Sequence, residues 1–175
     1  ARMYMHLVLS YQHLGDLHMQ ETCCKKGLSF FRNRPAGEIN MTKAMLWAEM
    51  AFAAILQSHS RRGLIFLDKA RKSCPAENAA ALEGRIESLA ASMHLIACNL
   101  RKARSASEKA ASILSHSEES YLACSAYSTL GGALAGIGRF PLALEKHAQA
   151  VSLSDKSRSV VLRSQALGNL AECLC

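Results

Sequence analysis

The sequence predicts an all-α fold in which antiparallel helix pairs stack into a solenoid. The 175 residues include 28 alanines and 24 leucines but only 3 prolines, which is a composition typical of helices. Val, Ile, Thr and turn residues are too few for a β-sandwich. A residue pattern also recurs at intervals of about 40 residues, and helix pairs that repeat in this way bury their apolar faces only by stacking.

The clearest copy of this pattern begins at Tyr127 and predicts two helices joined by a tight turn at Gly138-Arg139. Gly138 suits the left-handed conformation that ends many helices, and Pro141 suits the first turn of the helix that follows. The positions that define the pattern are Tyr127, Leu130, Gly131, Leu134, Ile137, Gly138, Phe140, Ala143, His147 and Ala150.

Tyr4, Trp47 and Leu167 match the position of Tyr127 in other copies. The four anchors are separated by 43, 80 and 40 residues, so the interval of 80 holds two units. The first helix of the third unit fits best with a shift of one residue, as Ile86, Leu89, Ala90 and Met93. We therefore expect an extra residue in the turn of that unit, near Cys98-Asn99.

Small residues in the repeat predict where helix backbones approach closely. Those on first helices are expected to face those on second helices, namely Val8, Ala51, Ala90, Gly131 and Ala171 against Gly63, Ala103 and Ala143. A second set is expected where one pair meets the next: Gly27, Ala70, Ala110 and Ala150. Gln20 is the exception, and it indicates a looser or more exposed first pair.

These copies predict one repeat array over residues 1–175, with units at about 1–35, 36–75, 76–115 and 116–156 and a final helix at 157–175. Residues 33–37 should break the helix between the first two units. Residues 115–118 have the spacing of a capping box, and residues 155–157 form a polar stretch before the final helix. The chain begins inside an amphipathic pattern, without a signal peptide, so we interpret it as a fragment of a larger protein.

Cysteine content predicts the compartment. The net charge is +7, from 21 basic and 14 acidic residues. The longest apolar stretch, residues 44–56, is interrupted by Glu49 and is too short to span a bilayer. The seven cysteines lack disulfide spacing, and reduced thiols fit best. We therefore expect a cytoplasmic protein, with the nucleus as the alternative.

The repeat resembles the tetratricopeptide repeat. The matching residues are Trp47, Ala70 and Pro75 in the second unit and Leu130, Gly131, Ala143 and Ala150 in the fourth. Because the usual period is about 34 residues, units of about 40 are similar to the longer repeats of G-protein-signalling modulator adaptors, kinesin light chains and rapsyn. The resemblance implies a right-handed superhelix and a non-catalytic scaffold that binds a partner peptide or helix in its concave groove.

By this resemblance, residues of the first helices that are not used in packing line the groove. Leu9 and Phe52 would anchor an amphipathic peptide, and Asn169 is similar to the asparagine with which such adaptors hold a ligand backbone; alternatively, Phe52 packs against its own loop. A chaperone-tail receptor is disfavoured, because the groove lacks the necessary Lys and Asn set. The expected partner-binding residues are Arg2, Met5, Leu9, Gln12, Glu49, Phe52, Leu56, Ser88, Ser128, Gln165, Asn169 and Glu172, with Ala91 and Gly132 beside them.

No constellation of catalytic, metal-binding or cofactor-binding residues stands out, so we expect no enzyme activity, metal or cofactor. His94 and Cys98 have the spacing of two metal ligands, but a structural zinc site needs four. No cationic helix N-terminus precedes Cys23-Cys24, which indicates inert thiols. The glycines at 131–138 lack the Lys-Ser/Thr of a phosphate-binding loop, and His147 is expected to be a packed, hydrogen-bonded core residue.

Two other functions remain open. The chain could be the regulatory or sensor array of a larger signalling ATPase or transcription activator. Binding of nucleic acid is less favoured, because aromatic residues do not interleave with the basic ones and 14 acids accompany them. The basic residues fall on second helices, on the expected convex side: Arg61, Arg62, Lys69, Arg71, Lys72, Arg101, Lys102, Arg104 and Lys109. The final residues, 165–175, invite self-association through the truncated end.

Overall fold

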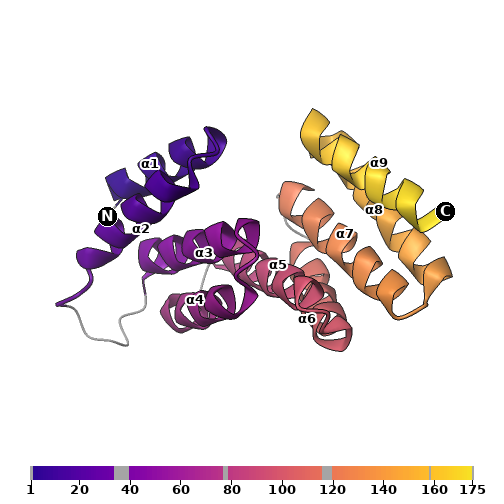
Figure 1. The fold of residues 1–175 in the computed structure, drawn as a ribbon, viewed down its shortest axis with the longest axis horizontal. Helices are drawn as coiled ribbons and strands as arrows, with labels where there is room; N and C mark the ends of the chain where they lie inside the picture. The colour runs from indigo at the N-terminus through magenta and orange to yellow at the C-terminus, as the bar shows by residue number, and fades with distance from the viewer. Residues whose placement is uncertain (1, 34–39, 77–78, 116–119, 158, 175) are drawn as a thin grey trace. The chain divides into compact units, whose positions relative to one another are not determined.

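The computed structural model describes residues 2–33, 40–76, 79–115, 120–157 and 159–174 (Figure 1). All regular structure in these ranges is helical, which confirms the predicted fold class. The helices are α1 (Arg2–His13), α2 (Leu17–Ser29), α3 (Met41–Leu56), α4 (Ser60–Ser73), α5 (Ala80–Ile96), α6 (Leu100–Leu114), α7 (Ser120–Gly136), α8 (Phe140–Ser157) and α9 (Val160–Leu174).

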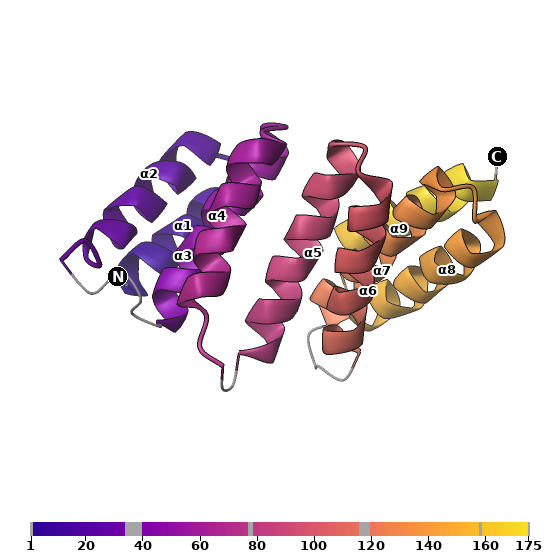
Figure 2. The same ribbon diagram turned by 90° about the horizontal axis from the view of Figure 1, so that it is seen from below.

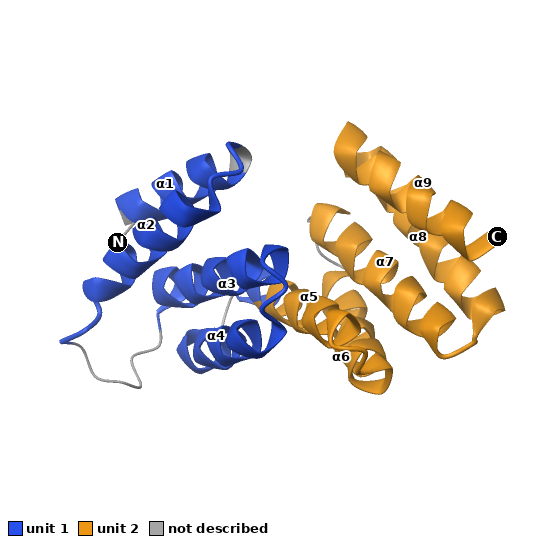
Figure 3. Ribbon diagram, in the orientation of Figure 1, with its two compact units in different colours: residues 1–82 blue, residues 83–175 orange. Residues whose placement is uncertain are grey.

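The chain divides into two compact units, residues 1–82 and 83–175, with the boundary in the first turn of α5 (Figure 3). The first unit holds the pairs α1–α2 and α3–α4. The second holds most of α5 together with α6, the pair α7–α8 and the single helix α9. That residues 1–175 form one continuous array stays a prediction.

The two helices of each pair are joined by the same backbone turn. One residue in each turn has a positive φ: Gly15, Ser58, Cys98 and Gly138. In each case the next amide donates to the carbonyl five residues earlier, as in Asn99 to His94 at 2.8 Å and Arg139 to Leu134 at 2.9 Å. The turn predicted at Gly138 is therefore confirmed, and α8 begins at Phe140 as the position of Pro141 requires.

The expected extra residue near Cys98 is wrong. Cys98 occupies the left-handed position of its turn, as Ser58 does 40 residues before it and Gly138 does 40 residues after it. The third unit is therefore in step with its neighbours, and its counterpart of Trp47 and Tyr127 is Glu87. Its small first-helix position is Ala91, which is fully buried, rather than Ala90.

Unit 1 has a core between α1, α2 and α3. Val8, Cys24 and Leu46 are buried there, with partly buried aromatic side chains around them. A Cβ on Gly27 would lie 2.9 Å from Leu46 Cδ1, so this glycine allows the close approach of α2 to α3 that the sequence predicts.

The expectation of a looser first pair at Gln20 is wrong. Gln20 is fully buried, and its Nε2 donates to Glu49 Oε2 of α3 at 3.5 Å. The amide is tolerated inside the core because a second buried polar group, from the next helix pair, lies within hydrogen-bonding distance.

In unit 2, α7 packs against α6, α8 and α9 (Figure 2). Ala110 of α6 is buried among alanines of α7, and Ala150 of α8 is buried beside Ala166 of α9. These contacts confirm that small residues lie where one pair meets the next. Gly131 does not face Ala143 as expected, because the side chain nearest to it is His147, on α8.

Two predicted helix boundaries, the break at 34–37 and the capping residues 116–118, lie outside the described residues. Asp16 caps α2 by accepting from the Met19 amide at 3.0 Å, and Asn40 caps α3 by accepting from the Lys43 amide at 3.2 Å. No helix in the described ranges is long and apolar enough to cross a membrane.

Candidate functional site

The candidate site is a pocket of about 430 Å³ in unit 2, formed mainly by α7 and α9. Four residues of the predicted groove line it: Ser128 and Gly132 from α7, and Asn169 and Glu172 from α9. His147 of α8 also lines it. The remaining lining residues are Leu95, Thr129, Ala135, Phe140 and Cys173.

The polar residues of the pocket are held by short hydrogen bonds between helices and within them. Asn169 Nδ2 donates to Ser128 Oγ at 2.6 Å, which ties α9 to α7. Thr129 Oγ1 donates to the Ser125 carbonyl at 3.0 Å. The Asn169 amide oxygen and the Thr129 hydroxyl oxygen remain as acceptors, and the second Nδ2 hydrogen of Asn169 and the Ser128 hydroxyl remain as donors.

His147 is the buried polar residue of the site, with 3% of its surface exposed. Its Nδ1 has no hydrogen-bond partner among the described residues, so the expected hydrogen-bonded histidine is packed but unpaired at this atom. Burial lowers the pKa of His147, and the nearby Glu172 carboxylate opposes that shift. The imidazole is therefore neutral at neutral pH.

A glycine makes room for this ring. A Cβ on Gly131 would lie 2.6 Å from Cε1 and Nε2 of His147, which is closer than real Cβ contacts allow. The residues that match Gly131 and His147 are Ala51 and Leu67 in the second pair, and Ala91 and Ser107 in the third pair; all four are fully buried. Among these three pairs, the largest polar residue on a second helix, His147, thus occurs together with the smallest residue on a first helix, Gly131.

Three residues predicted to line an open groove are buried instead. Glu49 is fully buried beside Gln20, Met5 belongs to the core of unit 1, and Ser88 is buried with its hydroxyl 3.4 Å from Ser125 Oγ. Ala91 is buried as well. These side chains contact a neighbouring helix. The periodicity of the sequence alone did not distinguish such residues from those on the open face.

The other predicted groove residues are at least partly accessible where their side chains are described. Leu9, Leu56, Gln165 and Glu172 are exposed, whereas Gln12, Phe52, Ser128 and Asn169 are half-buried. Nothing is described for the Arg2 side chain. Only the residues of unit 2 near Asn169 are brought together in the pocket.

Sequence reasoning missed several residues of the pocket. Thr129 and Leu95 were not selected, and His147 was interpreted only as a core residue. The signal that could have found Leu95 is its place on α5 opposite Gly132, where a Cβ would lie 3.3 Å from Leu95 Cδ2. That relation depends on the register of the third unit, which the sequence misplaced by one residue.

Unit 1 carries a separate surface on which basic and aromatic residues do meet, contrary to the expectation for the basic helices. Lys69 Nζ lies 4.5 Å from the Trp47 ring centroid, and Arg62 lies 5.4 Å from that of Phe66. The two rings stack on each other at 5.7 Å. Glu21 forms ion pairs with both Arg62 and Lys25, so part of this positive charge is already neutralised.

The described cysteines form no disulfide, and three of them, Cys23, Cys24 and Cys124, are buried. Cys23 and Cys24 are both buried, and burial, together with the Glu49 charge, raises the pKa of Cys24 well above its usual range. Within the described ranges, no group of three or more His, Cys, Asp or Glu residues is placed to hold a metal ion.

Comparisons of sequence and of structure give different results. No protein-family profile and no curated protein matches this sequence. The apo form of RapI aligns with a TM-score of 0.78 at 14% identity, over 98% of this chain and 62% of RapI. The fold is that of a tetratricopeptide-like helical repeat. This chain thus spans less than two thirds of RapI. A TPR-like protein from Chlorobium tepidum aligns with a TM-score of 0.62 at 18% identity, over 75% of this chain and 94% of that one.

Proposed function

We propose that this TPR-like chain is a non-catalytic scaffold that binds a partner peptide or helix along the exposed face of its first helices. The observation that carries the proposal is the pocket between α7 and α9, where polar side chains of two successive first helices converge on one space. Peptides that lie in helical grooves are recognised by such combinations of polar groups and apolar anchors.

The positions of Asn169 and Ser128 support the pocket as the centre of the binding surface. Their hydrogen bond fixes the amide, so its oxygen is oriented before a ligand arrives. An oriented acceptor of this kind reduces the entropy lost on binding. Leu95 and Phe140 supply apolar surface at the same pocket.

Selection from a displayed peptide library tests this function without a known partner. Peptides selected on the 175-residue chain should lose affinity for the Asn169→Ala variant by about tenfold, because one oriented hydrogen bond to a ligand backbone is lost. We expect Phe52→Asp to weaken peptides that extend onto unit 1. Binding is measured by titration calorimetry, and folding of each variant by circular dichroism.

Lys102→Ala is the matched control, since Lys102 is exposed on the second helix α6. This variant should bind the selected peptides as the parent chain does. Equal affinity of the parent and Asn169→Ala would show that the peptides bind elsewhere, and failure to select any peptide would contradict the scaffold function.

Two further expectations belong to this proposal. The exposed side chains of Val160, Val161 and Leu174 support self-association through α9, which light scattering at increasing protein concentration would detect. Residence in the cytoplasm, or in the nucleus, agrees with the absence of disulfides among the described cysteines. A regulatory array within a larger signalling protein stays a prediction.

A further inference from the structure

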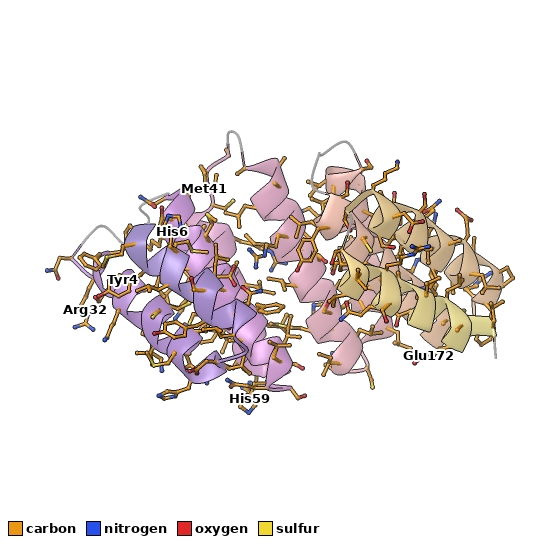
Figure 4. The ribbon with its side chains drawn as sticks, turned by 90° about the horizontal axis from the view of Figure 1, so that it is seen from above. Tyr4, His6, Arg32, Met41, His59 and Glu172 are labelled. Atoms are coloured by element: carbon orange, nitrogen blue, oxygen red, sulfur yellow. The ribbon has the colours of Figure 1, made fainter. Side chains whose placement is uncertain are left out.

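The charge of the pocket differs from the charge of the chain. The protein carries a net charge of +7, yet among the described residues that line the pocket only Glu172 is charged. Figure 4 labels Glu172 on α9. Its side chain is exposed and forms no ion pair with any described residue, whereas Glu21, Glu83, Glu87 and Glu108 each pair with a Lys or Arg.

The uncharged polar groups around Glu172 include acceptors as well as donors. One Nδ2 hydrogen of Asn169 is used by Ser128, and the Thr129 hydroxyl proton is used by the Ser125 carbonyl. The Asn169 amide oxygen and the Thr129 hydroxyl oxygen can accept from a ligand, while the second Nδ2 hydrogen of Asn169 and the Ser128 hydroxyl can donate. A ligand that satisfies the two acceptors must bring hydrogen-bond donors.

His147 adds no opposing charge. The ring is buried and neutral at neutral pH, because burial lowers its pKa, and its Nδ1 is a polar atom without a partner in the described chain. An anionic ligand finds no Lys or Arg among the described lining residues and would be repelled by Glu172. A cation instead gains the attraction of the Glu172 carboxylate.

We propose that this pocket is the specificity site of the scaffold and binds an arginine side chain of the partner segment, with Glu172 as its ion-pair partner. Five N–H donors on a planar guanidinium match a carboxylate and neighbouring oxygen acceptors better than a lysine ammonium does. Leu95 and Phe140 offer apolar surface to the methylene stem. This inference rests on the proposed function, because it names the residue type that a bound peptide must supply.

The pocket is tested with N-acetyl-arginine amide and with its neutral isostere N-acetyl-citrulline amide. Binding to the full 175-residue chain is followed by the NMR signal of His147 Cε1–H, which is assigned by its loss in His147→Gln. We expect arginine to bind at least about fivefold more tightly than citrulline. This preference should disappear in Glu172→Gln and weaken as salt is added.

Glu145→Gln is the control, because Glu145 is an exposed carboxylate on α8 that does not line the pocket. It should keep the preference for arginine. Equal binding of the two compounds, no shift of the His147 signal by either, or an arginine preference that survives Glu172→Gln would each overturn the proposal.

The library selection separates this proposal from the scaffold function itself. Selected peptides should be enriched in arginine, and replacing that arginine by citrulline should cost the same factor in affinity as Glu172→Gln does. Peptides that bind the pocket without arginine, and equally well to Glu172→Gln, would leave the scaffold function standing and overturn the arginine site. Arginine amide binding without any peptide binding would contradict the scaffold function alone.

Discussion

Gly131 is a residue at which a single methyl group should have a large effect on stability. In Gly131→Ala the new Cβ would lie 2.6 Å from the buried His147 ring. Overpacking of this kind costs about 1–3 kcal/mol, and the higher helix propensity of alanine offsets at most about 1 kcal/mol. We therefore expect a net loss of about 1–2 kcal/mol in the free energy of unfolding, measured by urea titration.

Two further variants make this prediction specific. Gly168→Ala is the control, because a Cβ there meets no atom within 4 Å, and it should stabilise the chain by about 0.5–1 kcal/mol. Gly131→Ala combined with His147→Ser recreates the Ala91 and Ser107 combination of the third pair. The double variant should be more stable than the sum of the two single changes, and strict additivity would contradict the contact.

His147 also predicts how stability depends on pH. Its pKa in the folded chain is lowered by burial, so below about pH 6.5 the unfolded chain binds more protons than the folded one. The free energy of unfolding should therefore fall as the pH drops below about 6.5, by at most about 1.4 kcal/mol per pH unit for this group. Above that pH, His147 should contribute no pH dependence.

The measurement compares urea titrations of the parent chain and of His147→Gln at a series of pH values from neutral to mildly acidic. The difference between the two proteins isolates His147 from the other six histidines. An identical pH dependence in the two proteins would show that the buried ring carries no pKa shift.

Particular residues show why the sequence predicted some positions and not others. Glycine and alanine at helix crossings carry a direct signal, since few other residues fit, and the roles of Gly27, Ala110 and Ala150 were predictable. Glu87 carries the opposite signal: an acidic residue stands where other units have an aromatic one. It is tolerated because Lys109 Nζ lies 3.2 Å from its Oε1. Hydrogen bonds with Glu83 and with Glu87 raise the pKa of Lys109.

Lys69 occupies the same position in its unit as Lys109 does in the next unit. Lys69 and Lys109 each lie eleven residues after the positive-φ residue of their turn, and each contacts the anchor of its own unit. Lys69 lies over the Trp47 ring, whereas Lys109 pairs with Glu87. A cation–π contact in one unit is thus replaced by an ion pair in the next, which no pattern of identical residues can reveal.

At the scale of the elements, the turns between paired helices are predictable only where they contain glycine. Gly138 was located from the sequence because glycine adopts positive φ without strain. Ser58 and Cys98 adopt the same conformation, with φ of 58° and 57°, although such values are uncommon for other residues. The missing glycine at position 98 is the physical reason that the register of α5 was misplaced.

Replacing Cys98 with glycine should therefore stabilise the third helix pair. The left-handed conformation costs a residue with a side chain about 1–2 kcal/mol, while glycine loses about 0.5–1 kcal/mol more in backbone entropy on folding. We expect Cys98→Gly to raise the free energy of unfolding by about 0.5–1 kcal/mol, measured by urea titration in reducing buffer.

Cys98→Ala separates the backbone effect from loss of the thiol. Cys98 is exposed, so its side chain contributes little packing, and the alanine variant should match the parent chain. Gly138→Ala should show the opposite sign, with a loss of about 1 kcal/mol. If Cys98→Gly and Cys98→Ala were equally stable, the turn would not hold the strain that its φ angle indicates.

At the scale of the whole chain, stability should vary along the sequence, because each helix pair of a repeat protein is stabilised by its nearest neighbours. α7 contacts α6, α8 and α9 and buries seven residues. α9 buries only Ala166, and Val160 and Val161 are 82% and 67% exposed. The composition predicts helices in both places, but how well each helix is covered depends on its neighbours in the fold.

Amide hydrogen exchange should therefore be faster in α9 than in α7. Local opening of a terminal helix exposes little apolar surface, so its amides exchange with a free energy well below that of global unfolding. We expect the α9 amides to be protected by several kcal/mol less than those of α7, measured by NMR or mass spectrometry at low protein concentration. If protection of α9 rises to that of α7 as the protein is concentrated, the exposed valines are covered by self-association. Equal protection at every concentration would contradict the assignment of α9 as the less stable helix.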